Sequence, residues 1–403
     1  MMNYLISAYS VNPYKGSEDS IGWNWVLQYE KNYKKGDRII LLTKKFNEKD
    51  TRRGLKEFNI QHVELVIVDV PNALNWFREK HSAFHHMYYI LWQHWAWLWV
   101  KHSGIRFDVI HHVTMNDYRI PSEMYKAKGA KVIWGPMGGA QVTPRPLKVY
   151  EKNQLVVSFR EFVNKSCSWN PFYKKALRSY YKIYCINNET QKQISRIVGK
   201  DVPLMPELAL RDEYKNLPIR KGNNDIFKIV FVGRLIGKKG IAFLVDALSL
   251  MPTDMDWELL IFGDGDDRGL IEKQIADSDI GKNVKLMGNR PLNQIAEAYQ
   301  QADVFVLPSL RETSGNVLLE AMAYAVPIVA FNTSFCAQLN EQKCGIFVNT
   351  NQELEGIRDE FCNALVRLAR DRQLCEDLGK NGYKFVNDEL TWTKKYEAIV
   401  KDV

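Results

Sequence analysis

Short runs of apolar residues alternate with longer helical segments along this 403-residue chain, and the alternation starts afresh after residue 220. Strands that are apolar on both faces belong to parallel sheets, because the helical crossovers between parallel strands cover both sides of the sheet. The sequence therefore predicts an α/β fold with two parallel sheets. The predicted strands lie at residues 4–8, 38–43, 63–68, 107–112 and 130–134, and then at residues 227–232, 257–262, 284–287, 304–307 and 327–330.

The length of the chain also favours two domains. One hydrophobic core rarely serves more than about 250–300 residues, and the hydrophobic fraction of 46% supplies enough apolar side chains for two cores. The polar, proline-bearing stretch at residues 203–225 is the predicted linker. We expect two Rossmann-like, doubly wound domains at residues 1–205 and 206–390, followed by a helix at residues 391–403 that can pack back on the first domain.

The charge and the cysteines narrow the class of protein. The net charge is +8, but Lys and Arg are spread along the chain, which suits an anionic ligand or an acidic membrane surface better than nucleic acid. The six cysteines form no CxxC pair, which indicates reduced thiols in a cytoplasmic protein. The N-terminal residues lack the basic segment and cleavage site of a signal peptide, and no 18 consecutive residues are apolar.

An aromatic-rich stretch at residues 72–102 has two interpretations. Aromatic residues recur in it at helical spacing, so one helix face is strongly apolar. The first interpretation is a helix that packs on the sheet. The second is a helix at the membrane surface, which would place the protein peripherally at the inner membrane face. The aromatic face consists of Tyr88, Trp92, Trp95 and Trp99, and the basic residues at its edges are Lys80, His81, His85 and Lys101.

A basic motif follows the first strand of the second series. Gly233 ends the strand, and Arg234 and Lys239 precede Gly240, near which a helix begins. The carboxyl ends of parallel strands are where α/β sheets bind ligands. Arg234 can bind two phosphate oxygens at once, and Lys239 supplies a compact charge. The alternative is a pair of solvated surface cations.

An acidic motif follows the strand at residues 304–307. Glu312 precedes a helix that starts near Ser314, and Glu320 lies within that helix. The free backbone amides of residues 314–317 would form an anion site at the positive end of the helix dipole. A glutamate in an apolar helix face needs hydrogen-bond partners, and a ribose diol would supply them to Glu320. The alternative partner of Glu320 is an Arg or a Lys.

Together the two motifs resemble those of glycosyltransferase family 4, the group 1 retaining glycosyltransferases of the GT-B fold. The resemblance rests on the spacing Glu312-x7-Glu320 and on the order Gly233-Arg234-Leu235-x3-Lys239-Gly240, and it covers residues 227–345. It implies two Rossmann-like domains that face a central cleft. The domain at residues 1–205 would bind the acceptor, and the domain at residues 206–390 would bind the nucleotide-sugar donor.

The resemblance also assigns roles to individual residues. Arg234 and Lys239 would bind the donor diphosphate. Glu320 would bind the ribose, and Glu312 would act in catalysis by binding hydroxyls of the transferred sugar. In a looser match at residues 13–18, Gly16 would lie in a loop near the reacting centre. The remaining donor contacts would come from Ser314, Gly315, Asn316 and Val317. The family usually has Gly-Phe where this chain has Thr313 and Ser314, which bears on the sugar and not on the phosphate site.

Two histidines, His111 and His112, end the predicted strand at residues 107–112. By resemblance, a histidine at this place contacts the donor sugar and takes part in catalysis. A histidine at the carboxyl end of a strand can donate to a sugar oxygen or share a proton. The alternative is a hydrogen-bonded histidine in the protein interior, and the sequence pattern fits either of the two residues.

The segment at residues 263–267 reads Gly-Asp-Gly-Asp-Asp. Asp264 and Asp266 are suitable ligands for a divalent metal ion, but a polar turn is needed directly after a strand in any case. We expect a turn, because basic residues and helix amides can already neutralise a diphosphate. No metal and no cofactor are therefore predicted, and the nucleoside diphosphate sugar is the co-substrate.

The predicted reaction moves a hexosyl group from a nucleoside diphosphate sugar to an acceptor hydroxyl. Fixed cations at the departing diphosphate lower the barrier, and the resemblance implies retention of the anomeric configuration. The expected context is the synthesis of a cell-surface polysaccharide or glycoconjugate, with a saccharide or a lipid-linked saccharide as the acceptor. The alternatives are a nucleotide-sugar epimerase or a phosphorylase on the same fold, and a non-catalytic subunit that binds a nucleotide sugar.

Overall fold

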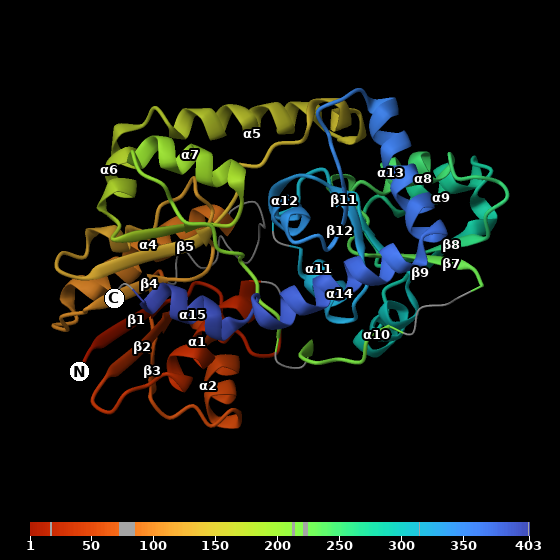
Figure 1. Ribbon diagram of the computed structural model, residues 1–403. Coiled ribbons are helices and arrows are strands. Elements are labelled where there is room, and N and C mark those ends of the chain that lie inside the picture. Colours follow the sequence, from red (N-terminus) through yellow and green to blue (C-terminus); the bar gives the residue numbers. More distant parts are fainter. Residues whose placement is uncertain (17, 72–84, 212–213, 221–224, 314, 402) are drawn as a thin grey trace. The chain divides into compact units, whose positions relative to one another are not determined.

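The chain forms two compact units in the computed structural model (Figure 1). Residues 141–162 group with the second unit and residues 392–403 with the first, so the chain passes between the units four times. The sequence predicted two domains that are each one continuous segment, at residues 1–205 and 206–390. Each observed unit instead consists of two or three separate segments. Unit 1 comprises Met1–Ala140, Val163–Glu207 and Trp392–Val403, and unit 2 comprises Gln141–Phe162 and Leu208–Thr391. The residues described are 1–16, 18–71, 85–211, 214–220, 225–313, 315–401 and 403.

Unit 1 contains a six-stranded parallel sheet with the order β3-β2-β1-β4-β5-β6. The direction of winding reverses between β1 and β4, as in Rossmann sheets. The strands are β1 (Asn3–Ser7), β2 (Arg38–Thr43), β3 (Val63–Ile67), β4 (Val109–His112), β5 (Lys131–Met137) and β6 (Lys182–Cys185). The helices are α1 (Glu18–Lys31), η1 (Lys45–Asn47), α2 (Glu48–Glu57), α4 (His85–His102), η3 (Glu123–Lys126), α6 (Pro171–Ser179), α7 (Asn188–Val198) and α15 (Trp392–Val400).

Unit 2 repeats this plan with the order β12-β11-β10-β7-β8-β9, and its winding reverses between β7 and β10. The strands are β7 (Phe227–Val232), β8 (Trp257–Phe262), β9 (Val284–Gly288), β10 (Val304–Leu307), β11 (Ile328–Phe331) and β12 (Gly345–Val348). The helices are η4 (Arg145–Tyr150), η6 (Gly237–Lys239), α8 (Ile241–Leu248), α9 (Arg268–Ala276), η7 (Gly281–Asn283), α10 (Leu292–Gln301), α11 (Asn316–Ala323), α12 (Ser334–Glu341), α13 (Leu354–Arg370) and α14 (Arg372–Asp388). Helix α5 (Gln154–Cys167) runs from unit 2 into unit 1. The two parallel sheets confirm the predicted fold class.

Local sequence explains where several helices begin and end. The side chain of Asn187 accepts a hydrogen bond from the amide of Thr190 and caps the start of α7. Gly199 ends the same helix with a φ of 77°, a left-handed conformation that suits glycine. The side chain of Asn170 caps α6 in the same way, and Pro171 occupies the first turn, where its missing N–H costs no helical hydrogen bond.

Helix α4 packs into the core of unit 1. Tyr89 and Trp92 are fully buried, and the indole nitrogen of Trp92 donates to the carbonyl of Val68 at 2.9 Å. For residues 85–102 the structure therefore favours the core interpretation of the aromatic-rich stretch. Residues 72–84, including Lys80 and His81, lie outside the described residues, as does the side chain of His85.

The last helix, α15, also belongs to unit 1 and packs on α1. The rings of Trp25 and Trp392 meet edge to face with centroids 5.5 Å apart, and those of Tyr29 and Tyr396 are 5.2 Å apart. Edge-to-face pairs of buried aromatic rings add to the stability gained from apolar burial. Residues near the two ends of the sequence are thus joined in one core.

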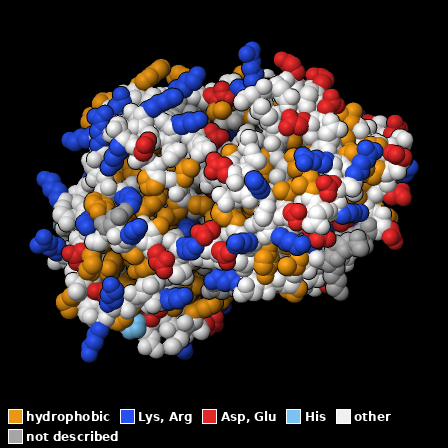
Figure 2. All heavy atoms as spheres, in the orientation of Figure 1, with side chains coloured by type: hydrophobic (Ala, Val, Ile, Leu, Met, Phe, Trp, Pro, Cys, Tyr) orange, Lys and Arg blue, Asp and Glu red, His pale blue; other side chains and the backbone are white. Residues whose placement is uncertain are grey.

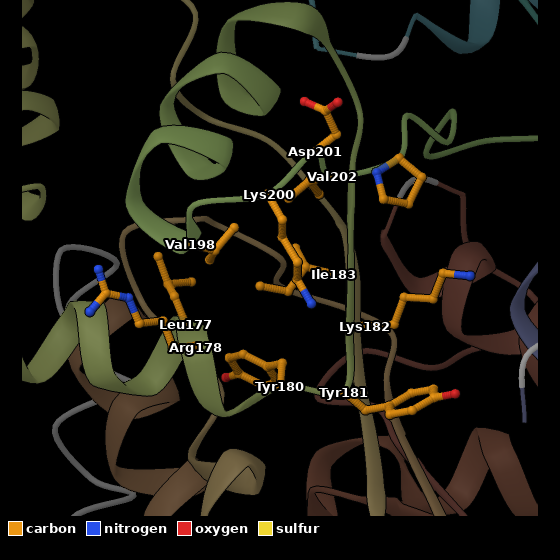
Figure 3. A pocket seen from close by; sticks show the side chains of 11 residues that line it. Leu177, Arg178, Tyr180, Tyr181, Lys182, Ile183, Val198, Lys200, Asp201 and Val202 are labelled. Atoms are coloured by element: carbon orange, nitrogen blue, oxygen red, sulfur yellow. The ribbon is translucent and has the colours of Figure 1, made fainter.

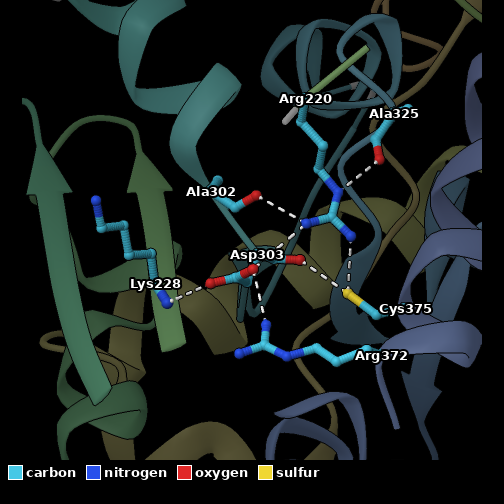
Figure 4. Close-up of polar contacts among 7 residues, drawn as sticks. All are labelled: Arg220, Lys228, Ala302, Asp303, Ala325, Arg372 and Cys375. Atoms are coloured by element: carbon cyan, nitrogen blue, oxygen red, sulfur yellow. Dashed lines mark hydrogen bonds and ion pairs between the residues drawn. The ribbon is translucent and has the colours of Figure 1, made fainter. Parts of the chain in front are cut away.

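A buried acidic residue, Asp303, fixes the amino ends of β7 and β10 in unit 2 (Figure 4). Its carboxylate accepts hydrogen bonds from Arg372 at 2.9 Å, from Arg220 at 3.4 Å and from the amide of Lys228 at 2.9 Å. Arg220 reaches further, to the thiol of Cys375 at 3.1 Å. A buried charge is tolerated only when it is paired and hydrogen-bonded, and Asp303 meets both conditions.

Replacement of Asp303 by asparagine is expected to destabilise the protein by about 3 kcal/mol, because it leaves two arginines beside a neutral, buried amide. The measurement is the free energy of unfolding by chemical denaturation. Asp377→Asn, an exposed change on α14, is the control and should stay within about 0.5 kcal/mol of the parent protein. Equal stability of the two variants would contradict the assigned role of Asp303.

Candidate active site

The two motifs found in the sequence come together at one edge of the unit 2 sheet. The basic motif follows β7, and the acidic motif follows β10. These strands are hydrogen-bonded neighbours, and Val230 pairs with Phe305. Their carboxyl ends flank the point where the strand order reverses, which is where doubly wound sheets bind ligands.

An ion pair joins the two motifs. The ammonium of Lys239 lies 2.6 Å from Oε2 of Glu312, and the side chains are only 17% and 11% exposed. The hydroxyl of Ser309 donates to the same oxygen at 3.0 Å, and the amide of Thr313 donates to Oε1 at 3.2 Å. Three donors therefore hold the Glu312 carboxylate in one position.

The backbones of the two loops also touch, and this contact requires a glycine. Gly240 has a φ of 71°, and a Cβ atom built there would lie 1.9 Å from the carbonyl oxygen of Pro308. The amide of Leu310 donates to the carbonyl of Lys238 at 2.9 Å. Any other residue at position 240 would push the loops apart, which explains the glycine of the basic motif.

Several positively charged side chains lie close together at the basic motif. Arg234 is exposed and, within the described parts of the chain, forms no ion pair. Burial lowers the pKa of Lys238, and the positive charges of Lys239, Arg234 and Arg311 lower it further against the opposing effect of Glu312. Cations held this close repel one another, so the binding of an anion between them would be favourable.

Helix α11 begins beside these cations and directs its amino end to the same edge. Gly315 precedes it with a φ of 60°. The amides of Asn316 and Val317 lie in the first turn, where the helix itself supplies no acceptor. They carry the positive end of the helix dipole. Ser314 lies outside the described residues.

Glu320 lies one helical turn further along α11, with its side chain 16% exposed. The hydroxyl of Tyr299 is 3.4 Å from one carboxylate oxygen, and the guanidinium of Arg211 is 3.9 Å from the other. The Arg partner considered as the alternative is therefore present, but at a distance too long for a hydrogen bond. The ribose-binding role stays a prediction.

The sequence of this part of the chain matches a known family. Residues 215–385 match the family model described as glycosyl transferases group 1. Residues 215–385 belong to the group 1 glycosyltransferases. The family resemblance inferred from the two motifs is thereby confirmed for this stretch, which contains Arg234, Lys239, Glu312 and Glu320.

Comparison with individual proteins also finds glycosyltransferases. The chain is 28% identical over 226 residues to the amylovoran biosynthesis glycosyltransferase AmsK of Erwinia amylovora. The aligned region covers 52% of this chain and 54% of AmsK. The chain thus spans about half the length of that relative.

Solved structures show the same fold along the whole chain. The lipopolysaccharide outer core galactosyltransferase WaaB is 17% identical, with a TM-score of 0.66 and coverage of 100% of both chains. Anabaena Alr3699/HepE in complex with UDP is 16% identical, with a TM-score of 0.62 and coverage of 100% of both chains. At this level of identity the likeness establishes the GT-B fold, as predicted.

The acidic segment at residues 263–267 is a turn in this glycosyltransferase domain. A Cβ atom on Gly263 would lie 2.0 Å from the carbonyl oxygen of Gly233, so the turn packs on the basic motif. Asp264 lies 3.6 Å from Arg268, and Asp267 forms an ion pair with Lys152. In the described part of the chain, no three His, Cys, Asp or Glu side chains cluster as metal ligands would.

Both histidines considered for catalysis are buried in unit 1. His112 contacts the hydroxyl of Ser7 at 2.9 Å through Nδ1 and that of Tyr89 at 2.8 Å through Nε2. His111 points to the opposite face of the sheet, with Tyr29 at 3.4 Å and the carbonyl of Gly135 at 3.3 Å. Burial lowers the pKa of each ring to about 3, so both are neutral. Neither ring is exposed to a ligand, and the interior alternative describes them.

Gly16 lies in the exposed loop that leaves β1 at the corresponding edge of the unit 1 sheet. Its neighbour Glu18 starts α1 and accepts a hydrogen bond from the amide of Met115, which follows β4, at 3.0 Å. Burial raises the pKa of Glu18 to about 8, and the nearby carboxylate of Glu207 adds to this shift. Glu18 thus lies beside the point where the strand order of unit 1 reverses. The role of Gly16 stays a prediction.

A segment that the sequence analysis missed braces the loop after β10. Residues 141–152 follow β5 along the chain but belong to unit 2. Glu151 lies 3.0 Å from Nε of Arg311, and the side chains are only 7% and 14% exposed. The amide of Gln141 donates to the hydroxyl of Thr313 at 2.7 Å. The partners are about 160 or more residues apart in sequence, so no local pattern signals them.

The same segment is anchored at its far end. The hydroxyl of Tyr150 donates to the carboxylate of Asp246 on α8 at 2.6 Å. Arg358 of α13 reaches that carboxylate at 2.8 Å and closes a three-residue cluster. With the ion pair between Lys152 and Asp267 at the start of α9, the segment is held against three helices and one loop.

A separate cavity of about 570 Å³ lies in unit 1, at the amino end of β6 and the carboxyl ends of α6 and α7 (Figure 3). Arg178, Lys182 and Lys200 are among its lining residues. Nε of Arg178 donates to the carbonyl of Ile197 at 3.2 Å, and Figure 3 shows its guanidinium pointing away from Lys200. Ligands of doubly wound sheets bind at the carboxyl ends of strands, so this cavity is distinct from the candidate site.

Replacement of Glu151 by glutamine is expected to loosen the loop after β10, because Arg311 loses its buried carboxylate partner. Amide hydrogen exchange at residues 309–313 should accelerate by about tenfold or more, whereas exchange within β10 should stay unchanged. Glu161→Gln is the matched control, since Glu161 pairs with Lys148 in the same segment. Equal exchange rates in both variants would show that the segment does not brace the loop.

Replacement of Glu18 by glutamine is expected to reduce the pH dependence of stability. The folded pKa of about 8 lies above the ordinary value of 4.5, so the folded protein holds an extra proton between these values. Stability from this carboxyl is complete below pH 4.5 and is lost as the pH rises through about 8. Glutamine mimics the protonated form, so the variant should lose less stability between pH 5.5 and 9.

Thermal unfolding midpoints of the two proteins at both pH values are the measurement. Glu376→Gln, an exposed change on α14, serves as the control and should follow the parent protein at both. A Glu18→Gln variant that loses as much stability as the parent protein would show that Glu18 is ionised throughout.

Proposed function

We propose that this chain transfers a sugar from a nucleoside diphosphate sugar to an acceptor hydroxyl. The observation that carries the proposal is the grouping of Arg234, Lys239 and the amino end of α11 around the carboxylate of Glu312. The first three features suit a diphosphate, and the carboxylate suits sugar hydroxyls. The complex of the similarly folded HepE with UDP supports a nucleoside diphosphate as the ligand class.

Negative charge develops on the departing diphosphate as the bond to the sugar breaks. In the proposed mechanism, Arg234 and Lys239 and the amides of Asn316 and Val317 stabilise that charge. These groups are fixed before the reaction begins, so they need little reorganisation in the transition state. We propose that they neutralise the leaving group without a metal ion and that Lys238 adds a third cation.

Glu312 is proposed to hold the transferred sugar. Its carboxylate is already oriented by Lys239, Ser309 and the amide of Thr313. When the donor binds, hydroxyls of the sugar would replace some of these three hydrogen-bond donors at the Glu312 carboxylate. The pair Glu312 and Glu320 would thus bind the donor, and neither would act as a nucleophile. We accordingly propose attack from the face of the departing phosphate, which takes the acceptor proton, with retention of configuration.

The proposed context is the synthesis of a cell-surface polysaccharide or glycoconjugate by a hexosyl transferase. The names of AmsK and WaaB, which refer to amylovoran and to lipopolysaccharide, support this context. Among the helices described here, none has both the length and the apolar composition needed to cross a membrane. We place the activity in the cytoplasm, at or near the inner membrane face.

The test compares nucleotide binding and sugar transfer in Lys239→Ala and Glu312→Gln. Loss of the lysine removes a charge-assisted hydrogen bond worth about 1.5–3 kcal/mol, so binding of UDP, GDP or ADP should weaken by about 10- to 100-fold. Loss of the Glu312 charge frees Lys239 for phosphate, so nucleotide binding should be kept or strengthened. Transfer should nevertheless fall by about 100-fold or more. Calorimetry measures binding, and NMR of the product measures transfer and the anomeric configuration.

Lys380→Ala, an exposed change on α14, is the control for loss of a lysine and should leave both quantities unchanged. Full transfer by Glu312→Gln would contradict the site assignment, and an inverted product would contradict the mechanism. Conversion of the sugar nucleotide without an acceptor would support the epimerase instead. Donor binding without turnover on any acceptor would indicate a non-catalytic subunit.

A further inference from the structure

The amino-terminal part of helix α5 exposes an apolar face. Leu155, Phe159 and Phe162 are 83%, 69% and 59% exposed and lie on one side of the helix. Val157 and Asn164, on the opposite side, are buried. The helix therefore packs on the protein through one face and presents its larger apolar side chains to solvent, the reverse of an ordinary surface helix.

Exposed apolar residues are concentrated around this helix. Scattered single residues on a surface need no explanation, whereas a contiguous patch marks an interaction site. Of the 20 large hydrophobic side chains that are exposed in the described residues, eight lie within residues 142–172. Those in unit 2 are Val142, Val149, Leu155, Val156, Phe159 and Phe162.

Positive charge is concentrated in a longer stretch of the sequence that includes this one. Residues 142–182 contain nine Lys or Arg and two Glu, a net charge of +7 out of +8 for the whole chain. Both glutamates are neutralised, because Glu151 pairs with Arg311 and Glu161 pairs with Lys148. Lys and Arg occur along the whole chain, as the sequence analysis stated, but elsewhere Asp and Glu nearly balance them. The net positive charge is therefore concentrated in residues 142–182. Figure 2 shows hydrophobic and basic side chains intermixed over α5.

We propose that the exposed face of α5 is a docking surface for an anionic lipid bilayer. Leu155, Phe159 and Phe162 would enter the boundary between the headgroups and the acyl chains, and nearby Lys and Arg would meet the lipid phosphates. A helix that lies in the bilayer surface has this combination of an apolar face and basic flanks. The surface differs from the aromatic-rich helix α4, whose Tyr89 and Trp92 are buried in the core.

Charge argues against the other occupants of such a surface. A second copy of the chain would bring a second stretch with a net charge of +7 against the first, which disfavours self-association. An acidic polysaccharide would match the charge but would leave the aliphatic and phenyl side chains without apolar partners. A bilayer with acidic headgroups satisfies both features.

The test measures binding of the full chain to vesicles by co-sedimentation, without donor or acceptor, so it is independent of the proposed activity. The vesicles are pure phosphatidylcholine and phosphatidylcholine with phosphatidylglycerol. We expect binding to the anionic vesicles that weakens as salt is added. Leu155→Ser with Phe159→Ser should reduce the partition coefficient by about tenfold or more. Lys165→Glu, which reverses an exposed charge on the same helix, should weaken the preference for anionic vesicles.

The matched control is Leu270→Ser with Leu292→Ser, two leucines of α9 and α10 that are 60% and 63% exposed. It should bind vesicles as the parent protein does, and unchanged thermal unfolding of all variants should show that each is folded. The proposal is overturned if the parent protein binds neither vesicle or if the α5 and control variants bind equally. It is also overturned if the α5 substitutions instead dissolve a dimer seen by light scattering.

Discussion

The ion pair between Lys239 and Glu312 joins loops that leave two different strands of the unit 2 sheet, and the rest of the candidate site is arranged around it. It forms only because Gly240 lets the backbone pass close to Pro308. Opposite charges held 2.6 Å apart in a mostly buried place orient each other while no ligand is bound. The site therefore exists before its ligand arrives, and neither loop can move without breaking the pair.

The same two strands are fixed at their other ends. Asp303 binds the amide of Lys228 at the start of β7 and draws Arg220 and Arg372 to the start of β10. Polar clusters thus hold β7 and β10 at both edges of the sheet, and apolar packing holds them between. The brace at residues 141–152 adds a third fixed point beside the loop after β10. The proposed stabilisation of developing charge would depend on such rigidity, because movable dipoles would have to be reoriented during the reaction.

The sequence predicted the fold class and the core of this site because both depend on local patterns. Ten strands were visible as apolar runs, and the two missed strands, β6 and β12, lie at the edges of their sheets. Arg234, Lys239 and Glu312 were found through motifs within single loops. Glu151 and Gln141 were missed because their partners are distant in sequence. His111 and His112 were placed correctly at a strand end, but their burial depends on contacts with Tyr29 of α1 and Tyr89 of α4, which are distant in sequence.

The interleaving of the two units has a consequence for the order in which they can mature. Unit 1 is completed by Trp392 and Tyr396, which cover Trp25 and Tyr29 of α1. During synthesis this surface stays uncovered until Trp392 and Tyr396, which follow all of unit 2 in the sequence, have been made. Unit 2 lies mostly within residues 208–391 and also needs residues 141–162, all of which emerge earlier. Unit 2 is therefore the first that can close its core, although most of unit 1 precedes it in the sequence.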